Sequence, residues 1–180
     1  HNEVTYPWTS FSDMKMSERS RQRMEEEPDT MPKTTEYEDR DPEALGMIAI
    51  QGNELSSHHH MNSFFSDHNG TTTEEESLEA TAAKNGITVL NHPGRYDKPV
   101  DWYIDLYRRY DHLIGLEVYN SGDRYPKDRD LWDAILTQTM PDRPVWGYSN
   151  DDMHGIASLG RNWSILILPE LSPEWVRQGM

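Results

Sequence analysis

Residues 87–120, "ITVLNHPGRYDKPVDWYIDLYRRYDHLIGLEVYN", contain two apolar runs separated by a helical pattern. The runs "ITVLN" and "IGLEVYN" have the length and apolar character of strands, and "PVDWYIDLYRRY" between them has the pattern of a helix. Continuous apolar strands separated by helices indicate a largely parallel sheet with helices outside it. This stretch therefore predicts an α/β fold.

The same alternation continues on both sides of this stretch. It allows either a closed barrel or an open doubly wound sheet, and the pattern alone does not choose between them. The other predicted strands are "GMIAIQGNE" (46–54), "HMNSFF" (60–65), "PVWGYSN" (144–150) and "NWSILIL" (162–168), and the other predicted helices are 74–85, 127–138 and one that begins near Ser172.

The helix predicted from Glu74 to Asn85 has recognisable signals at both ends. Thr73 and Glu76 have the spacing of a capping box, in which the two residues satisfy free amides at the start of a helix. Gly86 is expected to take the left-handed conformation that commonly follows a helix. These signals make this helix the best defined of the predicted elements.

The composition limits the classes of function. The 180 residues suit one domain, and 17 Lys and Arg against 32 Asp and Glu give a net charge of −15, which opposes nucleic acid. With no cysteine, a transition-metal site must use His and carboxylate ligands. No segment approaches the roughly 20 apolar residues of a membrane span. The composition therefore predicts a soluble chain, and its compartment and oligomeric state stay open.

The first 45 residues differ from the rest of the chain. They are polar and acidic, and they predict a short helix from about Met16 to Glu26 followed by a long loop. Two interpretations of residues 12–43 stay open, a solvated insertion and a lid over a site. The sequence begins with His1, so we expect an upstream segment to be missing from it.

Polar side chains with metal affinity recur at the ends of several predicted strands. Because the carboxyl ends of parallel strands form one face of a barrel, such residues can converge on one site. Asp152 and His154 lie two apart in "SNDDMH" (149–154), so on an extended backbone both point to the same side. Each residue also has a structural interpretation, as a hydrogen-bonded histidine or a buried carboxylate. The remaining candidates are Glu54, His60, His92, Glu117 and Asn120.

Four motifs in this order resemble the PHP (polymerase and histidinol phosphatase) family of metal-dependent phosphoesterases. "HN" (1–2) resembles the end of the family's T-D-H-N motif, and "GNELSSHHHMNSFF" (52–65) resembles its G-x-E segment followed by H-x-N-A-x-F. "VLNHPGRY" (89–96) and "GYSNDDMH" (147–154) resemble its N-H-P and G-S-D-A-H motifs. The family's first motif, H-x-H on strand one, has no counterpart.

The resemblance implies a distorted (β/α)7 barrel that spans residues 1–180 as one domain, with its first strand absent from this sequence. It also implies two or three divalent ions, for which mixed imidazole and carboxylate ligands favour Mn, Fe or Zn. The residues that it implies as metal ligands are Glu54 as a bridge, His60 and His92 on one ion, Asp152 on the other, and His1 and His154 on a third.

The function that the resemblance implies is hydrolysis of a small phosphate ester. Two metals about 3.5 to 4 Å apart clamp phosphoryl oxygens and lower the pKa of a bridging water to near neutrality. Arg95 either holds a phosphate oxygen or pairs with a carboxylate, and Glu117 and Asn120 are candidate substrate contacts. The alternative is a degenerate barrel that binds metal or a partner without turnover. A nuclease fits the family but not the acidic composition.

Overall fold

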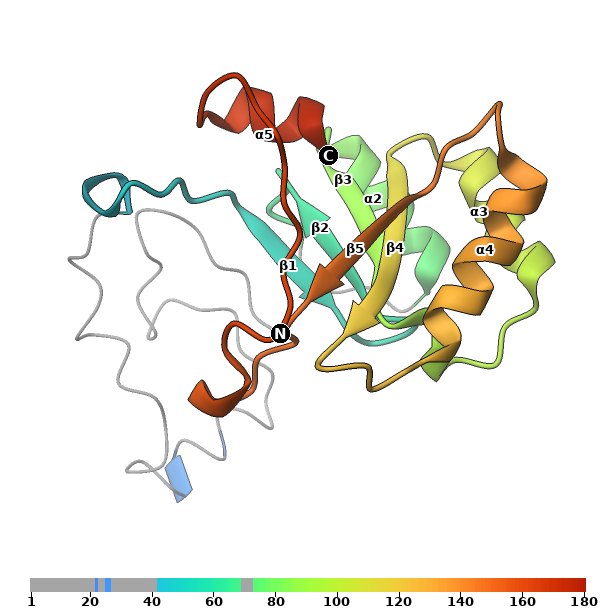
Figure 1. Cartoon of the computed structure of the whole chain (residues 1–180), viewed down its shortest axis with the longest axis horizontal. Helices are drawn as coiled ribbons and strands as arrows, with labels where there is room; N and C mark the ends of the chain where they lie inside the picture. Colours follow the sequence, from blue (N-terminus) through green and yellow to red (C-terminus); the bar gives the residue numbers. More distant parts are fainter. Residues whose placement is uncertain (1–21, 23–24, 27–41, 69–72) are drawn as a thin grey trace.

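The computed structural model describes residues 22, 25–26, 42–68 and 73–180 (Figure 1). Its centre is one open five-stranded mixed sheet with the strand order β1-β2-β3-β4-β5. The first two pairs in this order are antiparallel, and the last two are parallel. The strands are β1 (Gly52–Leu55), β2 (Met61–Phe64), β3 (Ile87–Leu90), β4 (Leu113–Asn120) and β5 (Trp146–Asn150).

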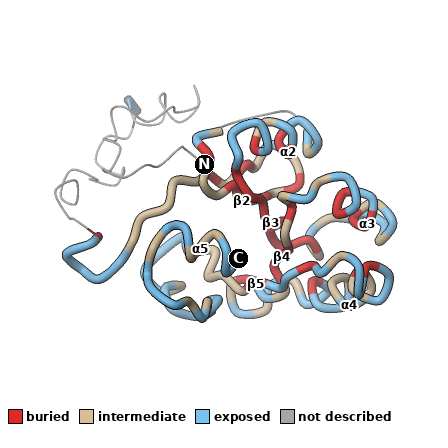
Figure 2. Tube along the Cα trace, turned by 90° about the horizontal axis from the view of Figure 1, so that it is seen from above, coloured by how far each residue is buried: buried red, intermediate tan, exposed pale blue. Residues whose placement is uncertain are grey.

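Three helices cover one face of this sheet (Figure 2). They are α2 (Glu74–Ala83), α3 (Val100–Arg109) and α4 (Lys127–Thr139). The hydrophobic core lies between them and the strands, and its largest fully buried side chains include Tyr103 and Tyr107 of α3. A short helix, α5 (Pro173–Gly179), lies on the other side of the sheet, where the Tyr148 hydroxyl donates to the backbone oxygen of Met180 at 2.7 Å.

The predicted α/β class is confirmed, but the predicted (β/α)7 barrel is wrong. The sheet does not close, because β1 and β5 form its two ends instead of pairing with each other. The hairpin of β1 and β2 is antiparallel, whereas a (β/α) barrel requires parallel strands throughout. Only the β3-α3-β4-α4-β5 half has the parallel strand and helix alternation that the sequence pattern predicted.

Two predicted strands are absent or shortened for local reasons. Of the strand predicted over 46–54, only the part from Gly52 onward forms a strand, β1 (Gly52–Leu55). The ladder with β2 ends with one further hydrogen bond, from the Phe65 amide to the Gln51 oxygen at 2.8 Å, and Phe65 has a positive φ of 57°. Residues 162–168 form no strand, because the side chain of Ser164 takes both backbone contacts of Ser149 (2.9 and 3.2 Å). The β5 edge is therefore met by a hydroxyl group instead of a sixth strand.

The helix signals were largely correct. The Thr73 side chain accepts from the Glu76 amide at 3.2 Å, as the capping box predicted. The left-handed residue after α2 is Asn85 (φ 56°), not the predicted Gly86. Gly86 is needed for another reason, since a Cβ there would lie 2.6 Å from the Thr81 side chain.

The predictions for the first 45 residues fall mostly outside the described residues. Of the helix predicted over 16–26, only residues 22, 25 and 26 are described, and all three are helical. The insertion or lid predicted over 12–43 lies outside the described residues except for these three and residues 42–43. Among the described residues, no helix is long and apolar enough to cross a membrane.

Candidate metal centre

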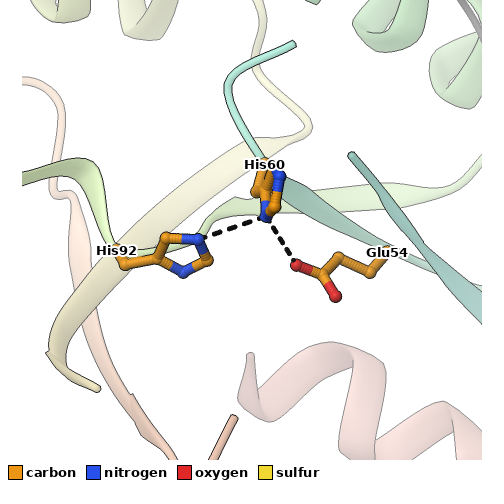
Figure 3. Close-up of side chains that lie close together, drawn as sticks. All are labelled: Glu54, His60 and His92. Carbon is orange, nitrogen blue, oxygen red and sulfur yellow. Dashed lines mark hydrogen bonds and ion pairs between the residues drawn. The ribbon is translucent and has the colours of Figure 1, made fainter. Parts of the chain in front are cut away.

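Three of the predicted ligands lie together at one end of the sheet (Figure 3). Glu54 lies in β1, His60 directly precedes β2, and His92 follows β3 by two residues. One ligand atom from each of these residues lies within 4.8 Å of the others. We name Glu54, His60 and His92 the metal triad. Antiparallel pairing of β1 with β2 and of β2 with β3 brings these three strand ends to one edge.

The contacts within the metal triad suit a divalent cation. His60 Nδ1 lies 3.0 Å from Glu54 Oε1 and 3.2 Å from His92 Nε2. When both imidazoles are neutral, one proton lies between His60 Nδ1 and His92 Nε2. A bound cation takes the place of that proton. Two imidazoles and one carboxylate form a common three-ligand set for catalytic Zn, which leaves a position open for water or substrate. The donor set therefore fits one divalent ion, and the predicted number and identity of the ions stay predictions.

Burial keeps His60 ready to bind metal. Desolvation by burial lowers the pKa of His60 below its ordinary 6.5, against the opposing effect of the neighbouring Glu54 carboxylate. The neutral imidazole, which is the form that binds metal, is thereby favoured at neutral pH.

Glu117 holds the most deeply buried member of the metal triad in place. Its carboxylate is 2% exposed, and its Oε2 accepts from the His92 backbone N–H at 2.6 Å and lies 3.2 Å from His92 Nδ1. Asn120 and Asn150 donate to the same carboxylate at 3.1 and 2.7 Å. With Nδ1–H directed at Glu117, His92 has its Nε2 lone pair free to bind an ion held with Glu54 and His60. The buried-carboxylate interpretation of Glu117 therefore agrees with its contacts better than a substrate contact does.

The backbone at His92 is strained. Its φ of 32° and ψ of 60° are left-handed, and the following Pro93 disfavours helical angles at this residue. Two carboxylates hold the turn: Glu117 on the His92 amide and Asp128 on the Gly94 amide at 2.5 Å. Non-glycine residues in such conformations cluster at functional sites, so the strain supports a functional role for His92.

Asp128, from the first turn of α4, is a site residue that the sequence analysis missed. The residue is fully buried, and its Oδ2 has no hydrogen-bond partner among the described residues. Burial raises the pKa of the Asp128 carboxyl to about 6, helped by the nearby charge of Glu117. The cue in the sequence was weak, because an acidic residue in the first turn of a helix is common without any special role.

Two tyrosine rings lie against the histidines of the metal triad. Tyr96 accepts from the His60 backbone N–H at 3.0 Å, and its ring lies 6.2 Å from those of His60 and His92. Tyr125 stacks on His92 at 5.5 Å between ring centroids. Tyr148, in β5, does not join them: it is buried, and its hydroxyl donates to the backbone oxygen of Met180.

The three consecutive histidines 58–60 have different roles. Only His60 joins the metal triad. His59 is buried, stacks on Tyr96 at 4.0 Å and lies 3.1 Å from the Tyr103 hydroxyl. Desolvation by burial lowers the pKa of His59 to about 3, so this side chain stays neutral. His58 Nε2 lies 2.5 Å from the Ser77 hydroxyl, a contact to α2.

No family model and no curated protein matches the chain. The resemblance to PHP phosphoesterases therefore stays a prediction.

Asp152 and His154 form a separate pair beyond β5. Asp152 Oδ1 lies 3.3 Å from His154 Nδ1, and its Oδ2 lies 4.0 Å from an Arg124 nitrogen. The strand ends at Asn150 and Asp152 has a φ of 47°, so the alternation of an extended strand does not explain why the two side chains meet. Neither joins the group that contains Glu54, His60 and His92 in the described part of the chain.

The remaining predicted residues lie at varying distances from the metal triad. Arg95 is exposed in the turn after His92, and its guanidinium lies 5.7 Å from the Tyr96 ring centroid. Asn120 is buried and contacts Glu117. His1 lies outside the described residues. Asn150, which completes the hydrogen bonds of Glu117, was quoted within a motif but not selected as a site residue.

Proposed function

We propose that the chain is a metal-dependent hydrolase of phosphate esters. The observation that supports this best is the metal triad, in which Glu54, His60 and His92 converge beside a strained backbone. The order of the four motifs supports the phosphoester class, because the resemblance to PHP phosphoesterases includes these same three residues.

The chain's own residues would divide the work as follows. Glu54, His60 and His92 hold the ion, and Glu117 fixes the tautomer and orientation of His92. When bound, a divalent ion such as Mn, Fe or Zn supplies Lewis acidity that lowers the pKa of water to near neutrality and offsets phosphoryl charge. Arg95, exposed beside Tyr96, would contact a phosphate oxygen. Tyr96 and Tyr125 limit access of bulk water to the imidazoles.

The number of ions is part of this proposal. One ion matches the metal triad, and a second requires Asp152, which in this structure contacts His154 and lies near Arg124. A third ion, implied by the resemblance, requires His1 with His154.

Binding of metal without turnover is the second candidate function. The observation that favours it is that Glu54, His60 and His92 are the one group able to hold an ion in the described part of the chain, whereas phosphoesterases of the two-metal class hold two ions at one centre. A single ion at the metal triad is compatible with either function.

The test is a hydrolysis screen on full chain reconstituted with Mn or Zn. We expect release of inorganic phosphate from one or more phosphate monoesters or diesters, and its loss in Glu54→Gln and His60→Asn. His68→Asn is the matched control, because it removes an imidazole beyond the opposite end of β2. Metal binding without hydrolysis of any ester would favour the second candidate. Equal activity in all variants would refute the site assignment.

A further inference from the structure

A second feature lies next to the metal triad, in the turn η5 (Pro93–Arg95) and the start of α4. It is a pocket of about 450 Å³ lined by residues of these two elements and of the segment that joins η5 to α3. We name it the basic pocket. Its lining residues are Pro93, Gly94, Arg95, Tyr96, Asp97, Lys98, Lys127 and Leu131.

The charge of the basic pocket is opposite to that of the chain. Three of its lining side chains are cationic, Arg95, Lys98 and Lys127, and one, Asp97, is a carboxylate, in a chain with a net charge of −15. Among the described residues, neither Arg95 nor Lys127 forms an ion pair. Cations without a carboxylate partner in an acidic protein indicate a site for an external anion.

Lys98 lines the pocket and is restrained by two contacts outside it. Its ammonium group lies 3.4 Å from the Glu74 carboxylate and 4.7 Å from the centroid of the Trp102 ring. The side chain is 38% exposed, so its charge stays accessible while its position is restrained. Lys127 is the first residue of α4, where the backbone amides of the first turn also favour negative charge.

The basic pocket and the metal triad share a wall but are not the same site. Tyr96 lines the pocket and also contacts His60 and lies near His92 through its ring. None of Glu54, His60 and His92 lines the pocket. An anion in the pocket is therefore a different group from one bound at the metal triad, and Tyr96 is common to both sites.

We propose that the basic pocket binds a second anionic group of the substrate, a phosphate or a carboxylate, separate from the ester that is hydrolysed. That the bound molecule is a substrate rests on the proposed function, whereas anion binding by the pocket does not. The pocket selects phosphate esters that carry another negative group over simple monoesters. Lys98 and Lys127 are the specificity-determining residues, and Arg95 is the third cation that lines the pocket.

The first test measures anion binding without metal. Full-length chain in the presence of a chelator is titrated with inorganic phosphate and, separately, with acetate, by calorimetry. The double variant Lys98→Met/Lys127→Met keeps the apolar stems and removes the charges. We expect it to bind the preferred anion at least about tenfold more weakly than the wild type, since charge-assisted hydrogen bonds are lost. The better ligand identifies the group as phosphate or carboxylate.

The control is Lys84→Met/Arg108→Met, which also removes two positive charges, but from the C-terminal ends of α2 and α3. We expect this control to bind anions as the wild type does. Absence of saturable binding by the wild type, unchanged binding by the pocket variant, or equal losses in both double variants would overturn the proposal. Because no hydrolysis is involved, these results are independent of whether the proposed function is correct.

The second test uses the metal-loaded enzyme and compares two substrates. For a phosphate ester that carries a second anionic group, we expect the pocket variant to raise KM about tenfold with kcat retained. For p-nitrophenyl phosphate, which lacks such a group, we expect an unchanged KM. Equal changes in KM for both substrates would refute the selection of a second group and assign the cations to the scissile phosphate.

Discussion

Replacing Glu117 tests how the metal triad is held together. The carboxylate is 2% exposed and is contacted by four donor groups: two from His92 and one each from Asn120 and Asn150. Glu117→Gln keeps the shape and one acceptor oxygen but loses the charge. Asn150 can rotate its amide by 180° to accept from the new NH2 group, so the fold is expected to tolerate this variant.

The magnitude follows from the role of Glu117 as the partner of a metal-binding imidazole. Loss of such a partner weakens metal affinity by about 10- to 100-fold, or about 1.4 to 2.7 kcal/mol. Glu117→Ala is expected to do more, because it leaves several buried donors without an acceptor at about 1 to 3 kcal/mol each. We therefore expect Glu117→Ala to lower the free energy of unfolding by about 3 kcal/mol or more.

Two measurements separate these effects. Competition with a chromophoric chelator gives the Zn affinity of wild type, Glu117→Gln and Glu117→Ala, and urea unfolding of the metal-free proteins gives their stability. The expected pattern for Glu117→Gln is a large change in metal affinity with a small change in stability. Wild-type Zn affinity in Glu117→Gln would refute the assignment of Glu117 as the partner that orients His92.

Three further predictions concern the surroundings of the site. His59 has a pKa of about 3 in the folded protein and about 6.5 when unfolded, so protonation of His59 favours unfolding. The contribution of neutral His59 to stability is therefore complete above pH 6.5 and falls as the pH drops toward 3. Wild type should lose about 2 kcal/mol more than His59→Phe between pH 7 and pH 5 in urea unfolding, and equal losses would contradict the burial of a neutral imidazole. Gly94→Ala places a Cβ 2.7 Å from a carboxylate oxygen in α4, so we expect the free energy of unfolding to fall by about 1 to 3 kcal/mol and Zn binding to weaken. The control is Gly155→Ala, whose new Cβ meets nothing within 4 Å, and it should match the wild type in both measurements. Asp152→Ala/His154→Ala should remove phosphoesterase activity and any metal beyond the first equivalent in elemental analysis, and full activity would exclude this pair from the centre.

The fold could be predicted where local pattern and tertiary pairing agree. The segment from Ile87 to Asn150 has continuous apolar strands separated by helices, and it folds as parallel strands with helices on one face. Whether the sheet is open or closed could not be predicted, because closure depends on whether the two edge strands pair with each other. At the β5 edge the side chain of Ser164 contacts the backbone of Ser149 where a sixth strand was expected, and such a contact has no periodic signal in the sequence.

The candidate site was predictable in part for a similar reason. Glu54, His60 and His92 were found because polar residues at strand ends meet at one edge of a sheet, even though β1 and β2 are antiparallel. Asp152 and His154 do meet, but through a left-handed turn instead of an extended strand. Asp128 was missed because its role depends on burial under Gly94, which only the packing of α4 creates.

The central claim is that Glu54, His60 and His92 hold a divalent metal ion, and elemental analysis tests it most directly. Full chain is purified without chelator, alongside Glu54→Gln/His60→Asn and the control His68→Asn. The account predicts at least about one equivalent of Mn, Fe or Zn in the wild type and the control, and its loss in the double variant. Less than about one tenth of an equivalent in the wild type, even after reconstitution with Mn or Zn, would contradict the account.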